Sequence, residues 1–221
     1  MMAIHFDPND PNIPQILRNR FEQWDNELPR LQFSQYGPMD KYLNLKFPYA
    51  MVKPQGMLRP ILRHNEDEDG LDDEAGNISI DSTGQFVSKA DPKCYPDFVV
   101  VNYYDDDYDK VRLVMEIGSL QKREPASDRV KSEVEQQLHN YMALLGAEGA
   151  RWSENTLGVA VLGTEVWFSK PRRLGTGLLF TRGMKWYSLY DEIFVKEIDR
   201  IARLLAKDEE NEVYDGPIVL D

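Results

Sequence analysis

Two apolar runs separated by a short acidic stretch are the feature that most constrains how this chain folds. The runs, "DFVVVNYY" at 97–104 and "VRLVMEIGSL" at 111–120, are rich in β-branched and aromatic residues. The stretch between them, "DDDYDK" at 105–110, is polar and is typical of a turn. We therefore predict two buried strands that pair as a hairpin.

Helical patterns occur at both ends and in the middle of the chain. We predict a first helix after its cap at Asp10 or Asn12 and before Pro29, a second at 127–147 and a third at 190–210. The first helix carries apolar residues at helical spacing, which are Ile13, Ile16, Leu17, Phe21, Trp24 and Leu28. The second carries Val130, Val134, Leu138, Tyr141 and Leu145 on one face.

The remaining segments read as strands, loops and a tail. We predict strands within 77–84, 84–90, 156–171 (two strands about Gly163) and 184–191, irregular structure with short strands at 32–62, an exposed acidic loop at 64–77 and a tail after 210. The order helix, strands, helix, strands, helix predicts one α/β or α+β domain over 1–221.

Composition excludes several classes of protein. The net charge of −12 disfavours non-specific coating of nucleic acid, which needs Lys and Arg, although a local basic groove remains compatible with it. The acidic surface also suits a protein partner. A lone Cys94 rules out an intramolecular disulfide. The N-terminus lacks a signal peptide, and no run reaches the roughly 18 apolar residues of a membrane span. We expect an intracellular protein, cytoplasmic or nuclear, with no membrane partner.

Two carboxylates belong to the predicted hairpin. Asp97 begins the first strand and Glu116 lies near the end of the second, so the hairpin brings both to one end of the sheet. Together with the carbonyl of Ile117, they would suit Mg²⁺ or Mn²⁺, which prefer oxygen ligands. On the following helix Gln137 and Tyr141 are four residues apart and share a face.

At these residues the chain resembles the PD-(D/E)XK nuclease superfamily. Pro96 and Asp97 resemble its Pro-Asp motif, Glu116 stands at its Glu-x-Lys motif, and "QLHNY" at 137–141 resembles the Gln-x-x-x-Tyr motif of the RecB-like branch. The chain is also similar to fungal proteins with this nuclease-like domain. The resemblance covers about Asp81 to Ser169, with the first helix as a family helix.

The resemblance implies a restriction-endonuclease-like core, which is a central mixed β-sheet flanked by helices. It also implies a Mg²⁺- or Mn²⁺-dependent nuclease that hydrolyses phosphodiester bonds of DNA or RNA, with Asp97 and Glu116 as ligands. A glutamate of the first helix, Glu22 or Glu27, is the candidate for a third carboxylate.

The chain departs from the family where the motif lysine would stand, because position 118 is glycine. Glycine can neither position the attacking water nor stabilise charge on the phosphate. Lys122 and Lys131 are the candidates for a relocated lysine. The basic stretch "KPRR" offers Lys170, Arg172 and Arg173 as phosphate contacts.

Other interpretations stay open. Asp97 can be a turn residue, Gln137 and Tyr141 a plain helix face, and "KPRR" a solvated turn. Glu116 is harder to dismiss, because an unpaired carboxylate inside an apolar strand is costly. Three functions remain: an active nuclease, a catalytically inactive nuclease-fold protein that binds protein or nucleic acid, and an unrelated α/β interaction domain.

Overall fold

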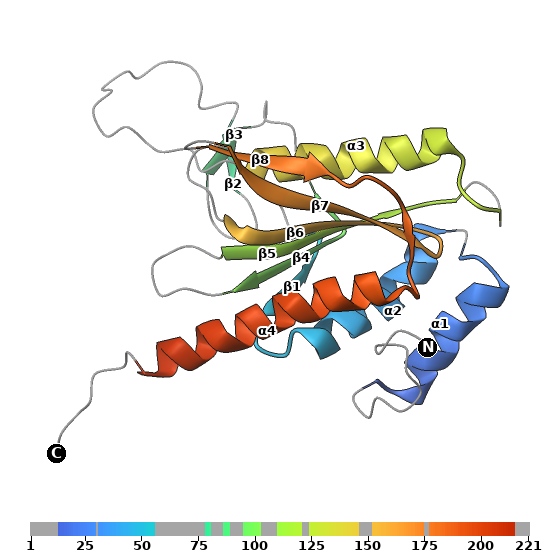
Figure 1. Ribbon diagram of the computed structural model, residues 1–221, viewed down its shortest axis with the longest axis horizontal. Coiled ribbons are helices and arrows are strands. Elements are labelled where there is room, and N and C mark those ends of the chain that lie inside the picture. The colour runs from blue at the N-terminus through green and yellow to red at the C-terminus, as the bar shows by residue number, and fades with distance from the viewer. Residues whose placement is uncertain are drawn as a thin grey trace.

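The computed structural model describes residues 13–29, 31–55, 78–80, 86–88, 95–102, 110–120, 124–145, 152–174 and 177–214. Its helices are α1 (Gln15–Asn26), α2 (Gln32–Lys46), α3 (Asp128–Leu145) and α4 (Glu192–Tyr214) (Figure 1). Its strands are β1 (Met51–Pro54), β2 (Ile78–Ile80), β3 (Phe86–Ser88), β4 (Phe98–Asn102), β5 (Lys110–Gly118), β6 (Trp152–Leu162), β7 (Glu165–Leu174), β8 (Gly177–Arg182) and β9 (Tyr187–Ser188). The predicted α/β class is confirmed.

The main sheet is mixed. Its strand order is β1-β4-β5-β6-β7-β8, and the short strand β9 pairs with β7. Neighbours pair antiparallel except β5 and β6, which are parallel and are joined through α3. The predicted hairpin is confirmed, with Phe98 opposite Met115 in the β4–β5 register. Strands β2 and β3 form a separate antiparallel pair, also as predicted.

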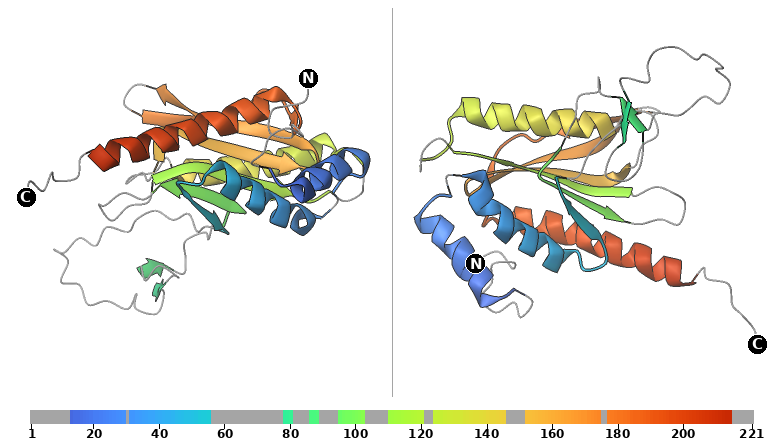
Figure 2. Two further views of the ribbon diagram at one scale, coloured as in Figure 1. Left: turned by 90° about the horizontal axis from the view of Figure 1, so that it is seen from below. Right: turned by 180° about the vertical axis from the view of Figure 1, so that it is seen from behind.

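Helices cover both faces of the main sheet. In Figures 1 and 2, α3 lies over one face, while α2 and α4 lie over the other and α1 lies beside α2. Successive residues of β5 accordingly belong to two different apolar clusters. Leu113, Met115 and Ile117 pack toward α2 and α4, and Val114 packs toward α3. This alternation fixes which side chains of β5 meet which helix.

The first helix forms as predicted, with two corrections. Its N-cap residue is Pro14, and no side chain caps the helix. Asp10 and Asn12, the predicted caps, lie outside the described residues. Ile16 was predicted to belong to the apolar face but is 82% exposed, because its neighbour Leu17 occupies the side of the helix that meets the core.

The prediction of irregular structure at 32–62 is wrong for its first half. Residues Gln32–Lys46 form α2 even though Pro38 lies inside the helix, where proline removes one main-chain hydrogen bond. Burial compensates for this loss, because Met39, Tyr42 and Leu43 are fully buried on one side of α2. Strand β1 is the short strand that was expected in the same segment.

Smaller differences concern the C-terminal third of the chain. Strand β8 was missed, and the strand expected at 184–191 is reduced to the two residues of β9. Helix α4 continues to Tyr214, into the region predicted as a tail. The acidic loop at 64–77 lies outside the described residues.

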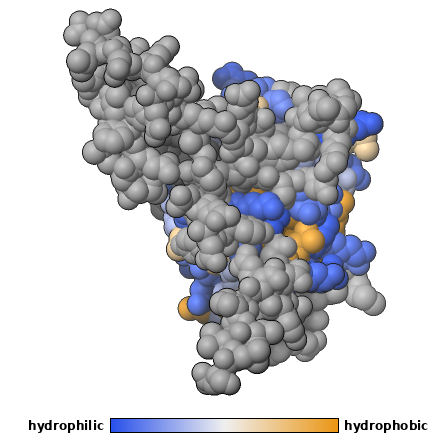
Figure 3. All heavy atoms as spheres, turned by 90° about the vertical axis from the view of Figure 1, so that its left-hand side faces the viewer, coloured by the Kyte–Doolittle hydropathy of each residue, from blue (hydrophilic) through white to orange (hydrophobic). Residues whose placement is uncertain are grey.

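Among the coloured residues on the face shown in Figure 3, hydrophilic ones cover most of the surface and hydrophobic ones form a small area. Large exposed apolar residues are scattered, and they are Ile16, Tyr49, Met51, Tyr95 and Met184. Within the described ranges, no helix is long and apolar enough to cross a membrane.

Candidate functional site

Asp97 and Glu116 lie side by side on the face of the sheet that α3 covers. The β4–β5 register pairs Phe98 with Met115. Asp97 precedes Phe98 and Glu116 follows Met115, so Asp97 and Glu116 lie opposite each other in the antiparallel pair. Both carboxylates are 5% exposed and both line one pocket of about 440 Å³. The structure therefore brings the two predicted ligands together at one end of the sheet.

Asp97 is held by hydrogen bonds on both carboxylate oxygens. The main-chain N–H of Ile117 donates to Oδ2 at 2.7 Å, and the Gln32 side chain donates to Oδ1 at 2.6 Å. Burial raises the pKa of Asp97, and these two hydrogen bonds oppose the rise. Ile117 thus supports the site through its N–H, whereas the sequence predicted a role for its carbonyl as a metal ligand.

Glu116 is the most perturbed acid of the site. Burial, and then repulsion from Asp97, raise its pKa from 4.5 to about 8, although hydrogen bonding to the Asp97 main chain and to the Gln137 side chain lowers it. Its Oε2 atom is buried and has no hydrogen-bond partner. A buried carboxylate oxygen without a partner is costly, so this position favours a cation or a proton donor that approaches from the pocket.

The pocket is built from five separate parts of the chain. Its lining residues are Gln32, Gln55, Tyr95, Asp97, Glu116, Ile117, Gly118, Ser119, Val130, Glu133, Val134 and Gln137. Sequence reasoning missed Gln32, Gln55, Tyr95, Ser119 and Glu133. The spacing of Glu133, one helical turn before Gln137, was the one available signal, since residues four apart share a helix face.

The Gln137–Tyr141 pair is divided between the pocket and the core. Gln137 lines the pocket, and its amide donates to the Tyr141 hydroxyl at 2.8 Å. Tyr141 itself is buried in the apolar cluster under α3 and does not line the pocket. Tyr141 therefore orients Gln137, and Gln137 in turn reaches Glu116.

Gly118 lines the pocket at the position where the sequence resemblance predicts a lysine. A Cβ atom there would lie 2.7 Å from Leu162 Cδ1 and 2.7 Å from Val134 Cγ2. These distances are far shorter than van der Waals contact, so any side chain at 118 displaces Leu162 or Val134. The space that a lysine stem would need is filled by the core under α3.

The two candidate replacements for the lysine have different outcomes. Lys131 does not line the pocket, because its ammonium group pairs with Glu165 at 2.6 Å and lies 5.6 Å from the Trp186 ring centroid. Lys122 lies outside the described residues. Among the lining residues that the structure describes, none is Lys or Arg.

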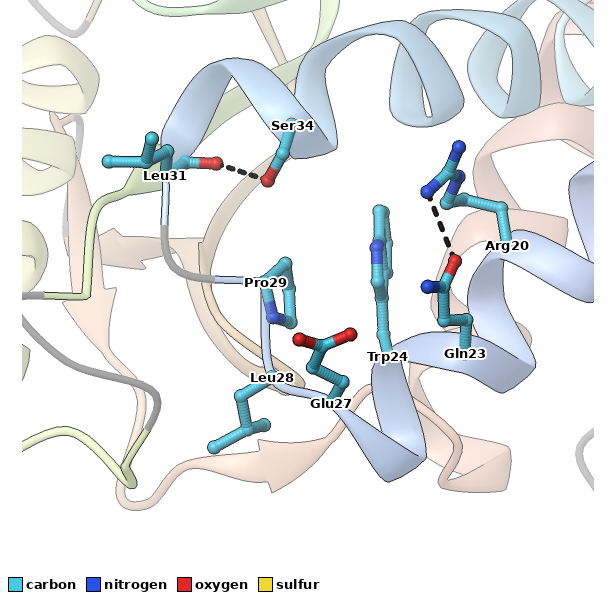
Figure 4. A pocket seen from close by; sticks show the side chains of 8 residues that line it. All are labelled: Arg20, Gln23, Trp24, Glu27, Leu28, Pro29, Leu31 and Ser34. Carbon is cyan, nitrogen blue, oxygen red and sulfur yellow. Dashed lines mark hydrogen bonds between the residues drawn. The ribbon is translucent and has the colours of Figure 1, made fainter.

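The predicted third carboxylates lie elsewhere. Glu22 is on the exposed side of α1 and does not line the pocket. Glu27 belongs to a second pocket, of about 420 Å³, where α1 meets the start of α2. Figure 4 shows the Glu27 side chain there beside Trp24 and Pro29. Neither glutamate lines the pocket that contains Asp97 and Glu116.

The predicted phosphate contacts also lie away from the pocket. Lys170 forms an ion pair with Glu197 of α4, so it extends over the opposite face of the sheet. Arg172 is exposed two residues further along β7, on the same face as Lys170. The side chain of Arg173 lies outside the described part of the structure.

The donor set fits a cation that keeps several water ligands. In the described parts of the chain, no group of three or more His, Cys, Asp or Glu side chains is arranged to hold a metal ion. Glu133 lines the pocket, but its side chain is 60% exposed and its carboxylate pairs with Arg129 at 2.9 Å. Two carboxylates with water suit Mg²⁺ or Mn²⁺ better than Zn²⁺, which requires three or four protein ligands.

Comparisons with known proteins leave the site to be interpreted from its own geometry. No protein-family model matches the chain, and neither the curated proteins nor the solved structures contain a match.

Proposed function

We propose that the protein is a Mg²⁺- or Mn²⁺-dependent nuclease of the PD-(D/E)XK type, with a restriction-endonuclease-like core, that hydrolyses phosphodiester bonds of DNA or RNA. The observation that carries the proposal is Glu116: a buried acid with an unpartnered oxygen, beside a second buried carboxylate, in an open pocket. Buried acids with strongly shifted pKa values concentrate at functional sites.

Each residue has a distinct part in the proposal. Asp97 and Glu116 bind the cation, which when bound would polarise the phosphate and acidify a water molecule. Gln32 and the Ile117 N–H fix the Asp97 carboxylate, and Gln137 fixes Glu116. Because these supports come from α2, β5 and α3, the two carboxylates are held in place before any ligand binds.

The first test is calorimetric titration of Mn²⁺ into the intact protein and into Asp97→Asn. We expect one binding site in the intact protein and a loss of at least about tenfold in affinity in the variant, since one of two charged ligands is removed. Asp40→Asn is the matched control, because Asp40 is a half-buried acid of α2 outside the pocket. Absence of Mn²⁺ binding in the folded intact protein would refute the metal site.

The second test is hydrolysis of labelled DNA and RNA in Mn²⁺, with Glu116→Gln as the matched inactive variant. We expect cleavage by the intact protein and none by Glu116→Gln. Cleavage that survives in the variant would come from a contaminating nuclease.

A catalytically inactive nuclease-fold protein is the second candidate, and a specific observation favours it. Leu162 and Val134 fill the space of the motif lysine at Gly118, and Lys131 is engaged with Glu165. A protein of this kind binds Mn²⁺ and a protein or nucleic-acid partner without hydrolysis. Mn²⁺ binding without cleavage of any DNA or RNA substrate would establish this candidate over the first.

A further inference from the structure

The composition of the carboxylate pocket indicates what it recognises. Besides the carboxylates, its polar lining consists of three amides, on Gln32, Gln55 and Gln137, and the hydroxyls of Tyr95 and Ser119. Within the described lining there is no Lys or Arg. Proteins that follow a nucleic-acid backbone neutralise several phosphates with basic side chains. This lining is instead suited to a base, which offers hydrogen-bond donors, acceptors and a flat face.

Tyr95 supplies an aromatic surface next to the carboxylates. It lies two residues before Asp97, lines the pocket and is 42% exposed. Most other aromatic residues near the sheet are buried in the core, as Phe98 is. An exposed tyrosine at a polar pocket is a stacking platform, because every base has a π face.

Gln55, which lines the pocket, has a strained main-chain conformation. It follows β1 with φ of 48°, a left-handed conformation that a residue with a side chain rarely adopts. Its N–H donates to the Asp97 carbonyl at 2.8 Å, so the strained residue is fixed directly beside the carboxylate pair. Glycine would adopt this conformation without strain, yet the chain places there a glutamine that lines the pocket.

The volume of the pocket limits the size of the ligand that it can hold. About 440 Å³ is at the lower end of the roughly 300–1,000 Å³ of small-molecule sites. Recognition of a duplex, in contrast, spreads over a broad surface, roughly 1,000–2,500 Å² of protein. The Oε2 atom of Glu116 is buried and has no hydrogen-bond partner. A ligand in the pocket, or a cation bound with it, would supply that partner.

We propose that this pocket binds one unpaired nucleotide, with its base stacked on Tyr95 and hydrogen-bonded by the Gln55 amide and its phosphate directed to the Asp97–Glu116 pair. The inference rests on the proposed function, because the cation supplies the positive charge that the lining lacks. The preferred ligand is therefore an unpaired nucleotide of a single strand, and a paired duplex binds poorly.

The test measures binding by fluorescence anisotropy in Mn²⁺, with hydrolysis-resistant phosphorothioate linkages in the strand and its integrity checked by gel. A labelled single strand is compared with the same strand annealed to its complement. We expect the single strand to bind at least about tenfold more tightly, since stacking on one aromatic residue has about that effect. We also expect a shallow dependence of affinity on salt, because few phosphates are neutralised. Equal affinity for strand and duplex would overturn the proposal.

Variants of the two residues localise the effect. Tyr95→Ala should weaken strand binding by about tenfold, and Tyr95→Phe should preserve it, because the ring remains. Tyr49→Ala is the matched control, since Tyr49 is 58% exposed and lies outside this pocket. Gln55→Gly should fold at least as well as the intact protein, because glycine relieves the strain, but should bind the strand several-fold more weakly. Unchanged affinity in both Tyr95→Ala and Gln55→Gly would also overturn the proposal.

Two further measurements distinguish a free nucleotide from a nucleotide within a strand, and nucleotide binding from Mn²⁺ binding. Competition by deoxyadenosine monophosphate would indicate that a free nucleotide suffices; retained strand preference without competition would assign the site to a nucleotide within a strand. Both results keep the proposal. Mn²⁺ titration of Tyr95→Ala should match the intact protein. If the intact protein binds Mn²⁺ but does not discriminate between strand and duplex, this inference fails while the metal site stands.

Discussion

The two sides of β5 differ in what they bury. Toward α2 and α4 the strand buries Leu113, Met115 and Ile117, which are at most 1% exposed and belong to the larger of the two apolar clusters. Toward α3 it presents Val114, then Glu116, then Gly118, so the apolar packing gives way to a carboxylate and then to a residue without a side chain.

The comparison shows how one strand combines a stabilising apolar side with a side that carries a buried carboxylate. Each fully buried apolar side chain on the first side stabilises the fold by about 1.5–3 kcal/mol. A buried carboxylate with an unpartnered oxygen costs a few kcal/mol, and the carboxylates stand on the second side. The larger apolar side therefore offsets the cost of keeping the pocket side polar.

The largest effect should follow from breaking the apolar side. Met115→Ala removes a fully buried side chain adjacent in sequence to Glu116, so we expect the free energy of unfolding to fall by about 2–5 kcal/mol. Chemical denaturation measures the change. Met184→Ala is the control, because Met184 is 99% exposed and its replacement should have almost no effect. A loss smaller than about 1 kcal/mol for Met115→Ala would mean that this side is not tightly packed.

Placing a side chain at position 118 should have the next largest effect. Gly118→Ala places a Cβ atom against Leu162 and Val134 at 2.7 Å, and we expect a loss of about 1–3 kcal/mol from overpacking. The double variant Gly118→Ala, Val134→Ala should be less destabilised than the sum of its two single variants, since each change relieves the other. Strict additivity in denaturation would show that Val134 does not occupy this space.

Glu116→Gln should act in the opposite direction to Met115→Ala. Glu116 has a pKa of about 8 when folded and an ordinary value of 4.5. Between these pH values the folded state holds one more proton than the unfolded state, so stability falls as pH rises from about 4.5 to about 8. Glutamine has no such dependence, and without metal we expect the variant to be more stable than the intact protein above about pH 8, by on the order of 1 kcal/mol.

Thermal denaturation of the intact protein and of Glu116→Gln across this pH range measures the difference. Addition of Mn²⁺ should raise the stability of the intact protein alone. Parallel pH profiles of the two proteins would contradict the shifted pKa.

The smallest effect should come from Lys131→Met. The ion pair with Glu165 is partly exposed, so we expect a loss below about 1 kcal/mol and unchanged Mn²⁺ affinity. Lys170→Met, which removes the corresponding pair with Glu197 on the other face, is the matched variant. Loss of cleavage in Lys131→Met with Mn²⁺ binding intact would assign this lysine to the reaction.

The local patterns of the chain predicted most elements that form the sheet and the helices on it. The β4–β5 hairpin, α3, the β6–β7 pair about Gly163 and α4 were all visible, because each has a sustained period or a polar turn. Helix α2 was not visible, because Pro38 and an irregular pattern obscure a helix whose stability comes from the burial of Met39, Tyr42 and Leu43. Strand β8 was missed as well.

For the site, the sequence by itself determined that Asp97 and Glu116 lie at one end of the sheet, because a hairpin brings the start of its first strand beside the end of its second. Their shared face was not determined by the sequence, because it depends on the register of β4 and β5, which shifts between Val100 and Val101. Only the tertiary structure decided what surrounds them. Gln55, Tyr95 and Glu133 reach the pocket from three distant segments, while Leu162 and Val134 close the space beside Gly118. Such contacts depend on how helices pack on the sheet, and packing is set by the shapes of all the buried side chains together.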